Sequence, residues 1–376
     1  MKPVIRSLTR WLYAHVAKPL LFRRKPDAVH HNLVTLTMLV QRVPGIRQLP
    51  RLWSHREDAY LAQTIHGITF HNPIGLSAGF DKQINMPRMM RSVGFGWMTG
   101  GSVTWGEYCG NDGAWFYRLP KSKSLVVNAG LPSEGTEVVA ERVAAHDPRL
   151  FADFPLSVSV AKTNSRHTVD EQQAIEDYCA SLARFDTIEQ VRMHEINISC
   201  PNTFGGEPFT TAARLDRLLK ATDALQLKKP VFIKMPSGLD IDGFDALLDT
   251  IAQHHVNGLT IGNLLKDRTA VKLDDVLPDE VRGNLSGAPT RAVTTELIRR
   301  AYRRHGDRLT IIGVGGVFSA EDAYEKIRAG AHLVALITGM IYEGPQLVGE
   351  INYGLVKLLR RDGFASVTDA VGVDAR

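Results

Sequence analysis

Eight short runs of apolar and β-branched residues, separated by stretches with helical spacing, constrain the fold of this chain more than any other feature. Strands that alternate with amphipathic helices are typical of a parallel sheet, because each helix returns the chain to the same edge. Eight such units predict an α/β fold in which the sheet closes into a (β/α)8 TIM barrel. The runs expected to form the strands are 74–79, 96–103, 156–160, 194–199, 231–235, 258–262, 309–314 and 333–338.

The helical segments between the strands follow the 3.6-residue period of an amphipathic helix. We expect them at 171–185, 210–226, 241–254, 290–304 and 319–329. A further segment, 104–128, is too long for a simple loop, and we expect it to form a hairpin over one mouth of the barrel.

The length of 376 residues exceeds the roughly 250 residues of a typical α/β barrel, so the chain has room for an appendage. We place a helical extension at residues 1–52 and the barrel at residues 53–376. Pro19 is expected to end or kink the first helix, and a second helix is expected from Pro26. The first helix carries apolar residues at helical spacing: Val4, Ile5, Leu8, Trp11, Leu12, Tyr13 and Val16.

The charge of the chain is concentrated in this extension. The formal net charge is +5, but seven of the 45 lysines and arginines lie in residues 1–25, which hold no acidic residue. The remaining 38 basic residues face 40 acidic ones, a net of −2. A near-neutral body argues against a nucleic-acid partner.

A basic amphipathic helix that carries a tryptophan is typical of a peripheral membrane anchor, so we expect a membrane-associated protein at the cytoplasmic face of the cell membrane. A helix packed on the body of the protein, or an organellar transit peptide that would place the protein at an inner membrane, are the alternatives. No run of 18 apolar residues predicts a membrane-spanning helix.

The three cysteines, Cys109, Cys179 and Cys200, form neither a CxxC motif nor a paired framework. This usage suits a reducing compartment, and we expect neither disulfides nor a metal site.

Polar residues gather where the expected strands end, which in this fold is the edge that carries the chemistry. Lys82 follows the first strand, Lys234 lies within the fifth, and Asn263 follows the sixth. A buried ammonium is unfavourable unless an anion compensates it. Either lysine alone would suit a structural ion pair, but two on one rim predict an anionic ligand.

Glycines follow the last two strands, in "GVGG" at residues 313–316 and in "TG" at residues 338–339. Loops after strands seven and eight are the recurrent phosphate site of this fold, since glycines let backbone N–H groups approach the oxygens. These loops predict a phosphorylated cofactor such as FMN.

Cys200 ends the fourth strand, in the stretch "EINISCPNTF". Free cysteines are often inert core residues, but this one lies between Asn197 and Asn202, whose amides could hold a planar amide or imide. A thiolate placed over such a ligand is a candidate general base.

With these motifs in place, the chain resembles the dihydroorotate dehydrogenases, flavin barrels that oxidise dihydroorotate to orotate in pyrimidine biosynthesis. The resemblance covers nearly the whole chain, in the order and spacing of the motifs "NPIGLSAGFDK", "GFGWMTGGSVT", "GNDGAWFYRL", "INISCPNT", "VFIKM", "GLTIGN", "LSGAP", "IIGVGGVFSAEDAYEKIRAGA" and "ITGMIYEGP".

The resemblance implies FMN on the rim, with Lys234 beside the flavin ring. It also implies that Cys200 removes a proton from carbon 5 of the substrate. The cofactor-binding residues that it implies are Ala78, Gly79, Lys82, Ser102, Ser159, Asn197, Lys234, Asn263, Gly287, Gly315, Gly316, Thr338 and Gly339. The substrate-binding residues that it implies are Lys82, Asn128, Asn197, Asn202 and Asn263.

The extension resembles that of the class 2 members of this family, in which N-terminal helices form a tunnel for quinone. A cysteine base is instead typical of the soluble class 1 members, so the chain is similar to a class 2 body with a class 1 base. A thiol has an ordinary pKa of about 8.5, and we therefore expect activity to persist to lower pH than with serine.

Three positions depart from the family pattern near the substrate. Leu264 stands where a hydroxyl residue is usual, Ser133 stands where a second asparagine would fall, and Ser159 replaces a frequent asparagine. Each lost polar partner could weaken binding by about 1–3 kcal/mol. The alternative function is therefore a related flavin oxidoreductase that acts on another dihydropyrimidine or cyclic amide.

Two further alternatives have weaker support. A degenerate flavin-binding or lipid-binding scaffold would not need Cys200, the asparagines and both lysines together. Dihydrouridine synthases share a flavin barrel with a cysteine but act on RNA, and the near-neutral body argues against that substrate.

Overall fold

A computed structural model describes residues 2–54 and 56–376 of the chain. Residues 1 and 55, which belong to the expected extension and the expected barrel respectively, lie outside the described residues.

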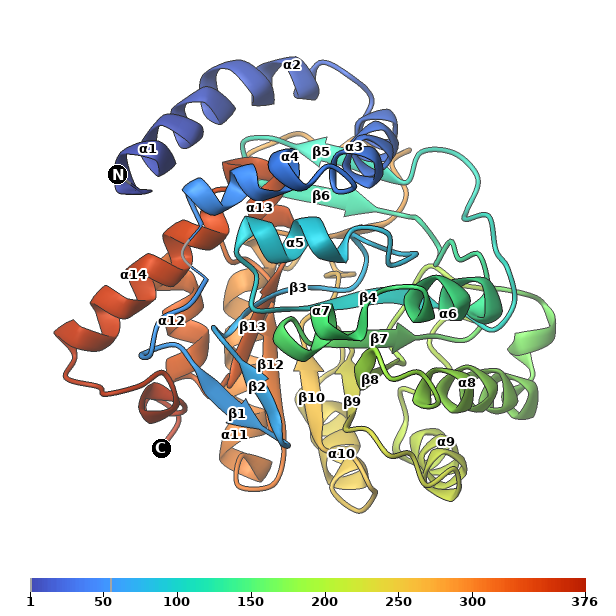
Figure 1. The fold of residues 1–376 in the computed structure, drawn as a ribbon. Helices are drawn as coiled ribbons and strands as arrows, with labels where there is room; N and C mark the ends of the chain where they lie inside the picture. Colours follow the sequence, from blue (N-terminus) through green and yellow to red (C-terminus); the bar gives the residue numbers. More distant parts are fainter. Residues whose placement is uncertain (1, 55) are drawn as a thin grey trace.

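Eight parallel strands close into a barrel within the described part of the chain (Figure 1). Neighbours around the barrel are consecutive in sequence, and the last strand pairs with the first through Val334 and Ile74. The (β/α)8 prediction is therefore confirmed. The strands are β3 (Ile74–Leu76), β4 (Trp97–Val103), β7 (Leu156–Val160), β8 (Val191–Asn197), β9 (Val231–Met235), β10 (Gly258–Ile261), β12 (Thr310–Val314) and β13 (Leu333–Leu336).

Helices surround the barrel and face it with their apolar sides. In α10, Phe244, Leu247, Leu248 and Ile251 are buried at the spacing of one helical face, and Asp240 caps the first turn. The helices are α5 (Pro87–Val93), α6 (Thr136–Ala144), α7 (Pro148–Asp153), α8 (Glu171–Asp186), α9 (Ala212–Ala224), α10 (Ile241–Ile251), α11 (Arg291–His305), α12 (Ala320–Arg328), α13 (Thr338–Glu343) and α14 (Leu347–Arg361). Short 3-10 turns are η3 (His167–Val169), η4 (Ala288–Thr290) and η5 (Thr368–Ala370).

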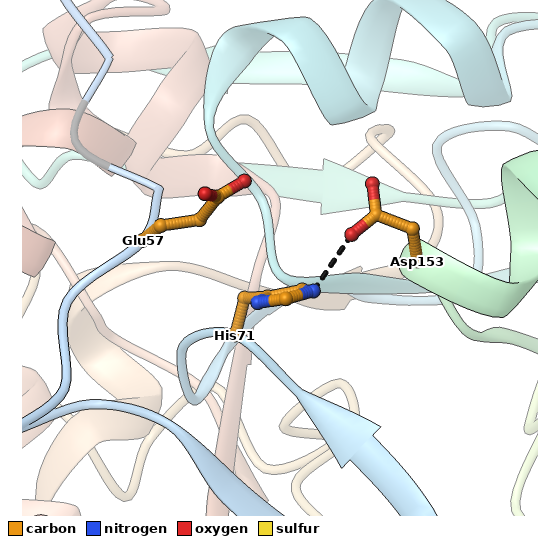
Figure 2. A group of neighbouring side chains, drawn as sticks. All are labelled: Glu57, His71 and Asp153. Atoms are coloured by element: carbon orange, nitrogen blue, oxygen red, sulfur yellow. Dashed lines mark ion pairs between the residues drawn. The ribbon is translucent and has the colours of Figure 1, made fainter.

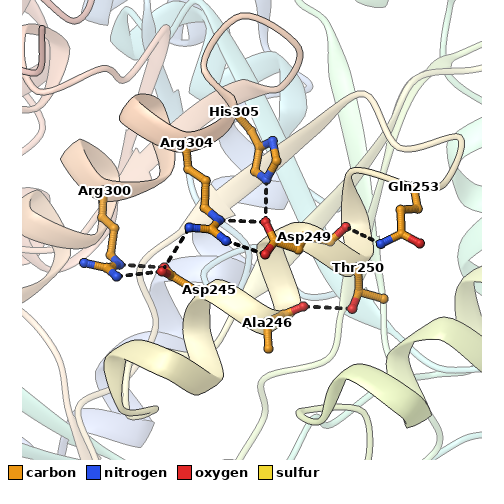
Figure 3. A network of polar contacts seen from close by, with 8 residues as sticks. All are labelled: Asp245, Ala246, Asp249, Thr250, Gln253, Arg300, Arg304 and His305. Carbon is orange, nitrogen blue, oxygen red and sulfur yellow. Dashed lines mark hydrogen bonds and ion pairs between the residues drawn. The ribbon is translucent and has the colours of Figure 1, made fainter.

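The outer faces of α10 and α11 are joined by a polar cluster (Figure 3). Asp245 accepts hydrogen bonds from Arg300 at 2.5 and 2.6 Å, and Asp249 pairs with Arg304 and with His305 at 2.9 Å. The hydrogen bonds from Arg304 lower the pKa of Asp249 to about 2. Because these groups are only partly buried and remain in contact with water, the cluster fixes the contact between the two helices more than it stabilises the fold.

Two small sheets close the ends of the barrel. The hairpin of β1 (Gln63–Ile65) and β2 (Ile68–Phe70) lies at the end where the strands begin, and Phe70 packs there against Trp97 and Phe232. The opposite end is covered by β5 (Phe116–Leu119), β6 (Ser124–Val127) and β11 (Asn284–Leu285). The hairpin expected within 104–128 is therefore confirmed, and the filled barrel interior leaves ligands only the rim.

The N-terminal extension lies across this second end (Figure 1). It comprises α1 (Lys2–Leu12), the π-helical turn η1 (Tyr13–Ala17), α2 (Lys18–Phe22), α3 (Pro26–Val40), α4 (Pro44–Gln48) and the 3-10 turn η2 (Leu49–Leu52). Pro19 was expected to end or kink the first helix, and it does not end it, because the backbone stays helical from α1 through η1 and α2. The π-helical turn η1 lies directly before the first residues of α2, where Pro19 lacks a backbone N–H donor.

The first helix places its apolar face outward. Val4, Leu8 and Trp11 are 72%, 55% and 54% exposed, whereas Arg6 is buried over the ring of Tyr353 and donates to the carbonyl of Gly349 at 3.3 Å. None of the helices in the described part of the chain has the length and hydrophobicity that a bilayer crossing requires.

Candidate functional site

Two adjoining cavities lie at the rim where the barrel strands end. The larger, of about 230 Å³, reaches from the barrel loops to α3 and β5, and the smaller, of about 100 Å³, lies at the loops after β12 and β13. Lys234, Asn263 and Thr338 line both, so the two cavities share a wall.

Most of the residues expected at a site line these cavities. Those in the larger cavity are Ala78, Gly79, Lys82, Ser102, Asn197, Cys200, Asn202, Lys234, Asn263 and Thr338. The smaller cavity adds Gly287, Gly315, Gly316 and Gly339. Asn128 and Ser159 line neither cavity. Ser159 hydrogen-bonds Ser102, which lines the larger cavity, and Asn128 accepts from Asn111, which lines neither.

Lys82 is a buried cation aimed into the larger cavity. Its Nζ atom has no hydrogen-bond partner among the described residues and lies 5.3 Å from the centre of the Phe116 ring. Burial lowers its pKa to about 8, against the opposing effect of Asp81 and Asp27. The buried Lys234 lines the same cavity, so both lysines expected on one rim meet there.

Cys200 lies at the wall of the larger cavity, three residues after β8 ends. Burial raises the pKa of its thiol to about 11, although the backbone N–H of Asn202 and the charge of Lys234 favour the thiolate. The ordinary value near 8.5 therefore does not hold in this site. The thiol is less acidic than expected, because desolvation of the thiolate outweighs its partners, and the expectation that a cysteine base works at lower pH than a serine base stays a prediction.

Three side chains from neighbouring strands form a hydrogen-bonded row beneath the cavity. Asn197 donates through Nδ2 to Oγ of Ser102 at 2.8 Å, and Ser102 lies 2.8 Å from Oγ of Ser159. Tyr178 donates to the carbonyl of Asn197 at 2.7 Å and fixes the end of β8. Ser159 thus supports Ser102 and does not itself reach the ligand space.

The amides expected to bind substrate are partly engaged by the protein itself. Asn202 donates to the carbonyl of Val127 at 3.1 Å and accepts from Asn284 at 3.0 Å. Asn263 donates to the carbonyl and hydroxyl of Ser199. An amide has two N–H donors and two acceptor positions, so both asparagines keep part of their capacity for a ligand.

Asn111 and Asn284 line neither cavity but hold Asn202, which does, and they were not singled out from the sequence. Asn111 donates to Oδ1 of Asn128 at 3.4 Å and to the carbonyl of Asn202 at 3.1 Å. Asn111 lies in "GNDG" and Asn284 directly precedes "LSG", so their motifs were visible. Their contacts with Asn202 were not, because these join residues 91 and 82 positions apart in the chain.

The smaller cavity is a glycine-lined cradle. Gly315 has a φ of +104°, and a Cβ atom there would lie 2.7 Å from Oγ1 of Thr290. A Cβ atom on Gly339 would lie 2.0 Å from the carbonyl oxygen of Val317. Glycine is therefore required at both positions, and the backbone is left open to close approach by a ligand.

Of the departures near the substrate pocket, Leu264 and Ser133 have different environments. Leu264 lines both cavities and gives their shared wall an apolar surface. Ser133 is buried outside them, where its Oγ atom accepts from the N–H groups of Thr104 and Gly135 at 3.2 Å. Ser133 is thus a turn residue in this fold.

A group of possible metal ligands, Glu57, His71 and Asp153, lies away from this rim (Figure 2). His71 pairs with Asp153 at 2.7 Å, and both Arg56 and Arg91 also bind Asp153. The guanidinium groups of Arg56 and Arg91 already pair with the carboxylate of Asp153 and would repel a metal cation there. We therefore interpret this group as an ion-pair network.

The chain is similar to known proteins over nearly its whole length. A family model described as "Dihydroorotate dehydrogenase" matches residues 60–359. A protein of Deinococcus deserti named "Dihydroorotate dehydrogenase (quinone)" is 34% identical over 97% of this chain and 100% of its own length. A protein of the same name from Anaeromyxobacter dehalogenans strain 2CP-C is 36% identical over 96% of both chains.

Solved structures agree with this similarity. A crystal structure titled as DHODH in complex with ferulenol, from Eimeria tenella, superimposes with a TM-score of 0.82 at 27% identity and covers 94% of this chain and 96% of its own.

Replacement of Lys82 by methionine should stabilise the ligand-free protein at pH 7 by about 1–3 kcal/mol, since it removes a buried ammonium without a partner. The folded-state pKa of Lys82 is lowered to about 8, so above pH 8 the folded wild-type protein loses this proton before the unfolded chain does and gains stability. The difference in the free energy of unfolding between Lys82→Met and the wild-type protein should therefore be smaller at pH 9.5 than at pH 7. Urea titration measures both effects.

Lys229→Met is the matched control. The pKa of Lys229 is also lowered to about 8 by burial, but its Nζ atom donates to the carbonyls of Phe185 and Ile188. Its loss should destabilise the protein, because two carbonyls lose their donor. A Lys82→Met protein less stable than wild type at pH 7 would contradict the assignment of Lys82 as an unpaired cation.

Proposed function

The chain belongs to the dihydroorotate dehydrogenase family, and we propose that it oxidises dihydroorotate to orotate with a quinone as the electron acceptor. The observation that carries the proposal is the rim, which brings Lys82, Lys234 and Cys200 around one cavity. As an enzyme of this family it is an oxidoreductase, and its product belongs to pyrimidine biosynthesis.

The family is flavin-dependent, and FMN is the flavin that fits these cavities. A flat ring suits the larger cavity, where the unpartnered Lys82 and the buried Lys234 offer positive charge. A phosphate suits the glycine cradle at Gly315, Gly316 and Gly339, where backbone approaches closely. When bound, the flavin would supply a two-electron acceptor for the hydride of substrate carbon 6 and would pass both electrons on to the quinone.

The substrate is an anion with a planar amide and imide edge. Lys82 compensates the negative charge in the cavity, and Asn197, Asn202 and Asn263 offer the amide groups that match that edge. The row of Ser159, Ser102 and Asn197 fixes the orientation of the Asn197 amide. Asn128 acts from behind this wall through Asn111.

Cys200 is the proposed general base, which takes the proton from substrate carbon 5. Its thiolate is favoured by Lys234 and by the backbone N–H of Asn202. Burial of the thiol nonetheless raises its pKa to about 11, so only a small fraction of the ligand-free enzyme carries a thiolate near pH 7.

Residues 1–52 are the proposed quinone-binding extension, and the barrel from residue 53 onward is the catalytic domain. The outer part of the larger cavity is lined by Pro26, Val29 and Leu33 of α3, by Phe116 and by Ile341, which form an apolar passage. His30 is packed edge-on against Phe80 and Phe116, and burial lowers its pKa to about 3. A neutral His30 can donate one hydrogen bond to a quinone carbonyl.

The outward apolar face of α1 supports a peripheral membrane site for the quinone-linked reaction. Val4, Leu8 and Trp11 are exposed, and the basic residues of this segment could approach anionic headgroups. A helix that packed on the body by its apolar stripe would bury these residues and leave Arg6 outside, and the reverse is found.

A different cyclic amide remains the second candidate, because Leu264 leaves no hydroxyl at that point of the cavity wall. The two candidate functions are separated by the rate at which dihydroorotate and dihydrouracil each reduce the enzyme's flavin without oxygen. Faster flavin bleaching by dihydrouracil would favour the second candidate.

Replacement of Cys200 by alanine should slow flavin reduction by dihydroorotate by about 10²–10⁴-fold, the usual contribution of a general base. In the wild-type enzyme the rate should still be rising between pH 7 and pH 9, because the thiol has a pKa of about 11 and its deprotonated fraction grows with pH. Anaerobic stopped-flow absorbance measures this rate. Cys179→Ala is the control, since Cys179 lies outside the cavity.

A pH profile of Cys200→Ser that is the same as that of the wild-type enzyme would contradict the role of Cys200 as base. A wild-type rate that levels off above about pH 9 would show instead that bound ligands restore an ordinary thiol pKa near 8.5.

Replacement of His30 by alanine should raise the KM for a short-chain quinone by about 2- to 10-fold, the loss of one neutral hydrogen bond. Flavin reduction by dihydroorotate should be unchanged. The exposed His31 on the same helix offers a matched control, His31→Ala. Reoxidation of the reduced flavin by fumarate or NAD in preference to quinone, or no bleaching by dihydroorotate at all, would overturn the proposed function.

Replacement of Leu8 by aspartate should lower binding to vesicles that contain phosphatidylglycerol by about 10-fold or more, since it places a charge in the apolar face of α1. Vesicle co-sedimentation measures this binding. Ile241→Asp introduces the same charge at an exposed apolar residue of α10 and should have no effect. Equal binding by both variants and the wild-type protein would argue against α1 as the anchor.

A further inference from the structure

Another buried lysine, Lys326, lies beside the glycine cradle, and it was not singled out from the sequence as a site residue. Lys326 lies on α12 and is 0% exposed. Its Nζ atom donates to Oγ1 of Thr294 at 2.8 Å and to Oγ1 of Thr295 at 3.1 Å, both on α11. These partners are neutral, and among the described residues no carboxylate forms an ion pair with this ammonium. A buried cation held by hydroxyls alone is unfavourable without a nearby anion.

The ammonium lies directly behind the glycine cradle. Oγ1 of Thr294, which accepts from Lys326, would lie 2.9 Å from a Cβ atom on Gly315. The same Oγ1 atom donates to the carbonyl of Thr290 at 2.9 Å, and Thr290 and Gly315 both line the smaller cavity. One hydroxyl group thus separates the ammonium from the backbone of the cradle.

The front of the cradle carries little charge of its own. Among the described residues that line the smaller cavity, Lys234 is the one charged side chain, and the rest offer backbone groups, hydroxyls and apolar surface. Backbone N–H groups hold a phosphate by hydrogen bonds, but a dianion in a half-buried site also needs compensating charge.

We propose that Lys326 is a positioning residue for the phosphate end of the cofactor, whose charge it compensates from behind the Gly315–Gly316 loop through Thr294. The proposal rests on the proposed function in one respect, the assignment of FMN to the two cavities. It adds that the affinity for the phosphate depends on the ammonium of Lys326, which does not contact the phosphate, as well as on the residues of the cradle.

The charged groups that act on Lys326 are Glu325 and Asp322 on its own helix and Arg291 on α11. Arg291 is itself paired with both carboxylates, so these charges largely offset one another. Burial is the dominant effect and lowers the pKa of Lys326 to about 7. A phosphate in the cradle would hold the ammonium in its charged form.

The test compares two flavins that differ only in the phosphate. The full-length protein, stripped of cofactor, is titrated with FMN and with riboflavin, and flavin fluorescence reports each Kd. In Lys326→Met the affinity for FMN should fall by about 10-fold or more, the effect of a unit charge several ångströms from a dianion, and the affinity for riboflavin should change by less than about 2-fold. A control variant, Lys229→Met, removes a partly buried lysine that lines neither cavity and should leave the ratio of the two affinities unchanged.

A second measurement uses the wild-type protein, so the test does not depend on the folding of a variant. Between pH 7 and pH 9 the FMN phosphate stays doubly charged while Lys326 in the cofactor-free protein loses its proton. The preference for FMN over riboflavin should therefore fall as pH rises.

Equal loss of affinity for both flavins in Lys326→Met, or an FMN preference in the wild-type protein that does not change with pH, would overturn the proposal and leave Lys326 as a tether between α11 and α12. The proposed function fails separately, if the FMN-loaded wild-type protein is not bleached by dihydroorotate.

Discussion

The closure of the parallel barrel is the constraint on which the rest of the structure depends. All eight pairings around the closed barrel are parallel, so the barrel strands run in the same direction and end at one rim. Bulky side chains such as Trp97 and Phe232 fill the interior, so no ligand can enter the barrel itself. Residues that are far apart in sequence, such as Lys82 and Thr338, therefore meet at this rim, where both line the larger cavity.

The rim holds positive charge that the protein does not neutralise. Lys82 has no hydrogen-bond partner among the described residues, and Lys326 is held only by threonine hydroxyls. Each of these ammonium groups reduces the stability of the ligand-free fold because it has lost its water. The arrangement is consistent with a site that reaches its lowest energy with an anion bound. The same desolvation acts in the opposite direction on Cys200, whose thiol it keeps protonated.

The N-terminal extension connects this rim to the surface. Its helix α3 forms part of the wall of the larger cavity, while α1 presents its apolar residues to solvent and buries Arg6 against α14. An apolar surface and an apolar passage thus belong to one continuous segment of chain. A hydrophobic electron acceptor such as a quinone can bind to both, which is why we propose that the extension carries the acceptor to the site of the reaction.

The sequence by itself determined the fold and the place of the chemistry. Strand and helix patterns are local, so β-branched runs and helical spacing predicted all eight barrel strands, and the strand-end motifs marked Cys200, Lys82 and the glycine loops. Only the tertiary structure decided the partners of these groups. Contacts such as Asn284 with Asn202, and Lys326 with Thr294, join separate segments whose distance is not encoded locally. The shift of the Cys200 pKa and the outward apolar face of α1 were likewise settled by burial, because desolvation depends on everything that packs around a group and not on its neighbours in the chain.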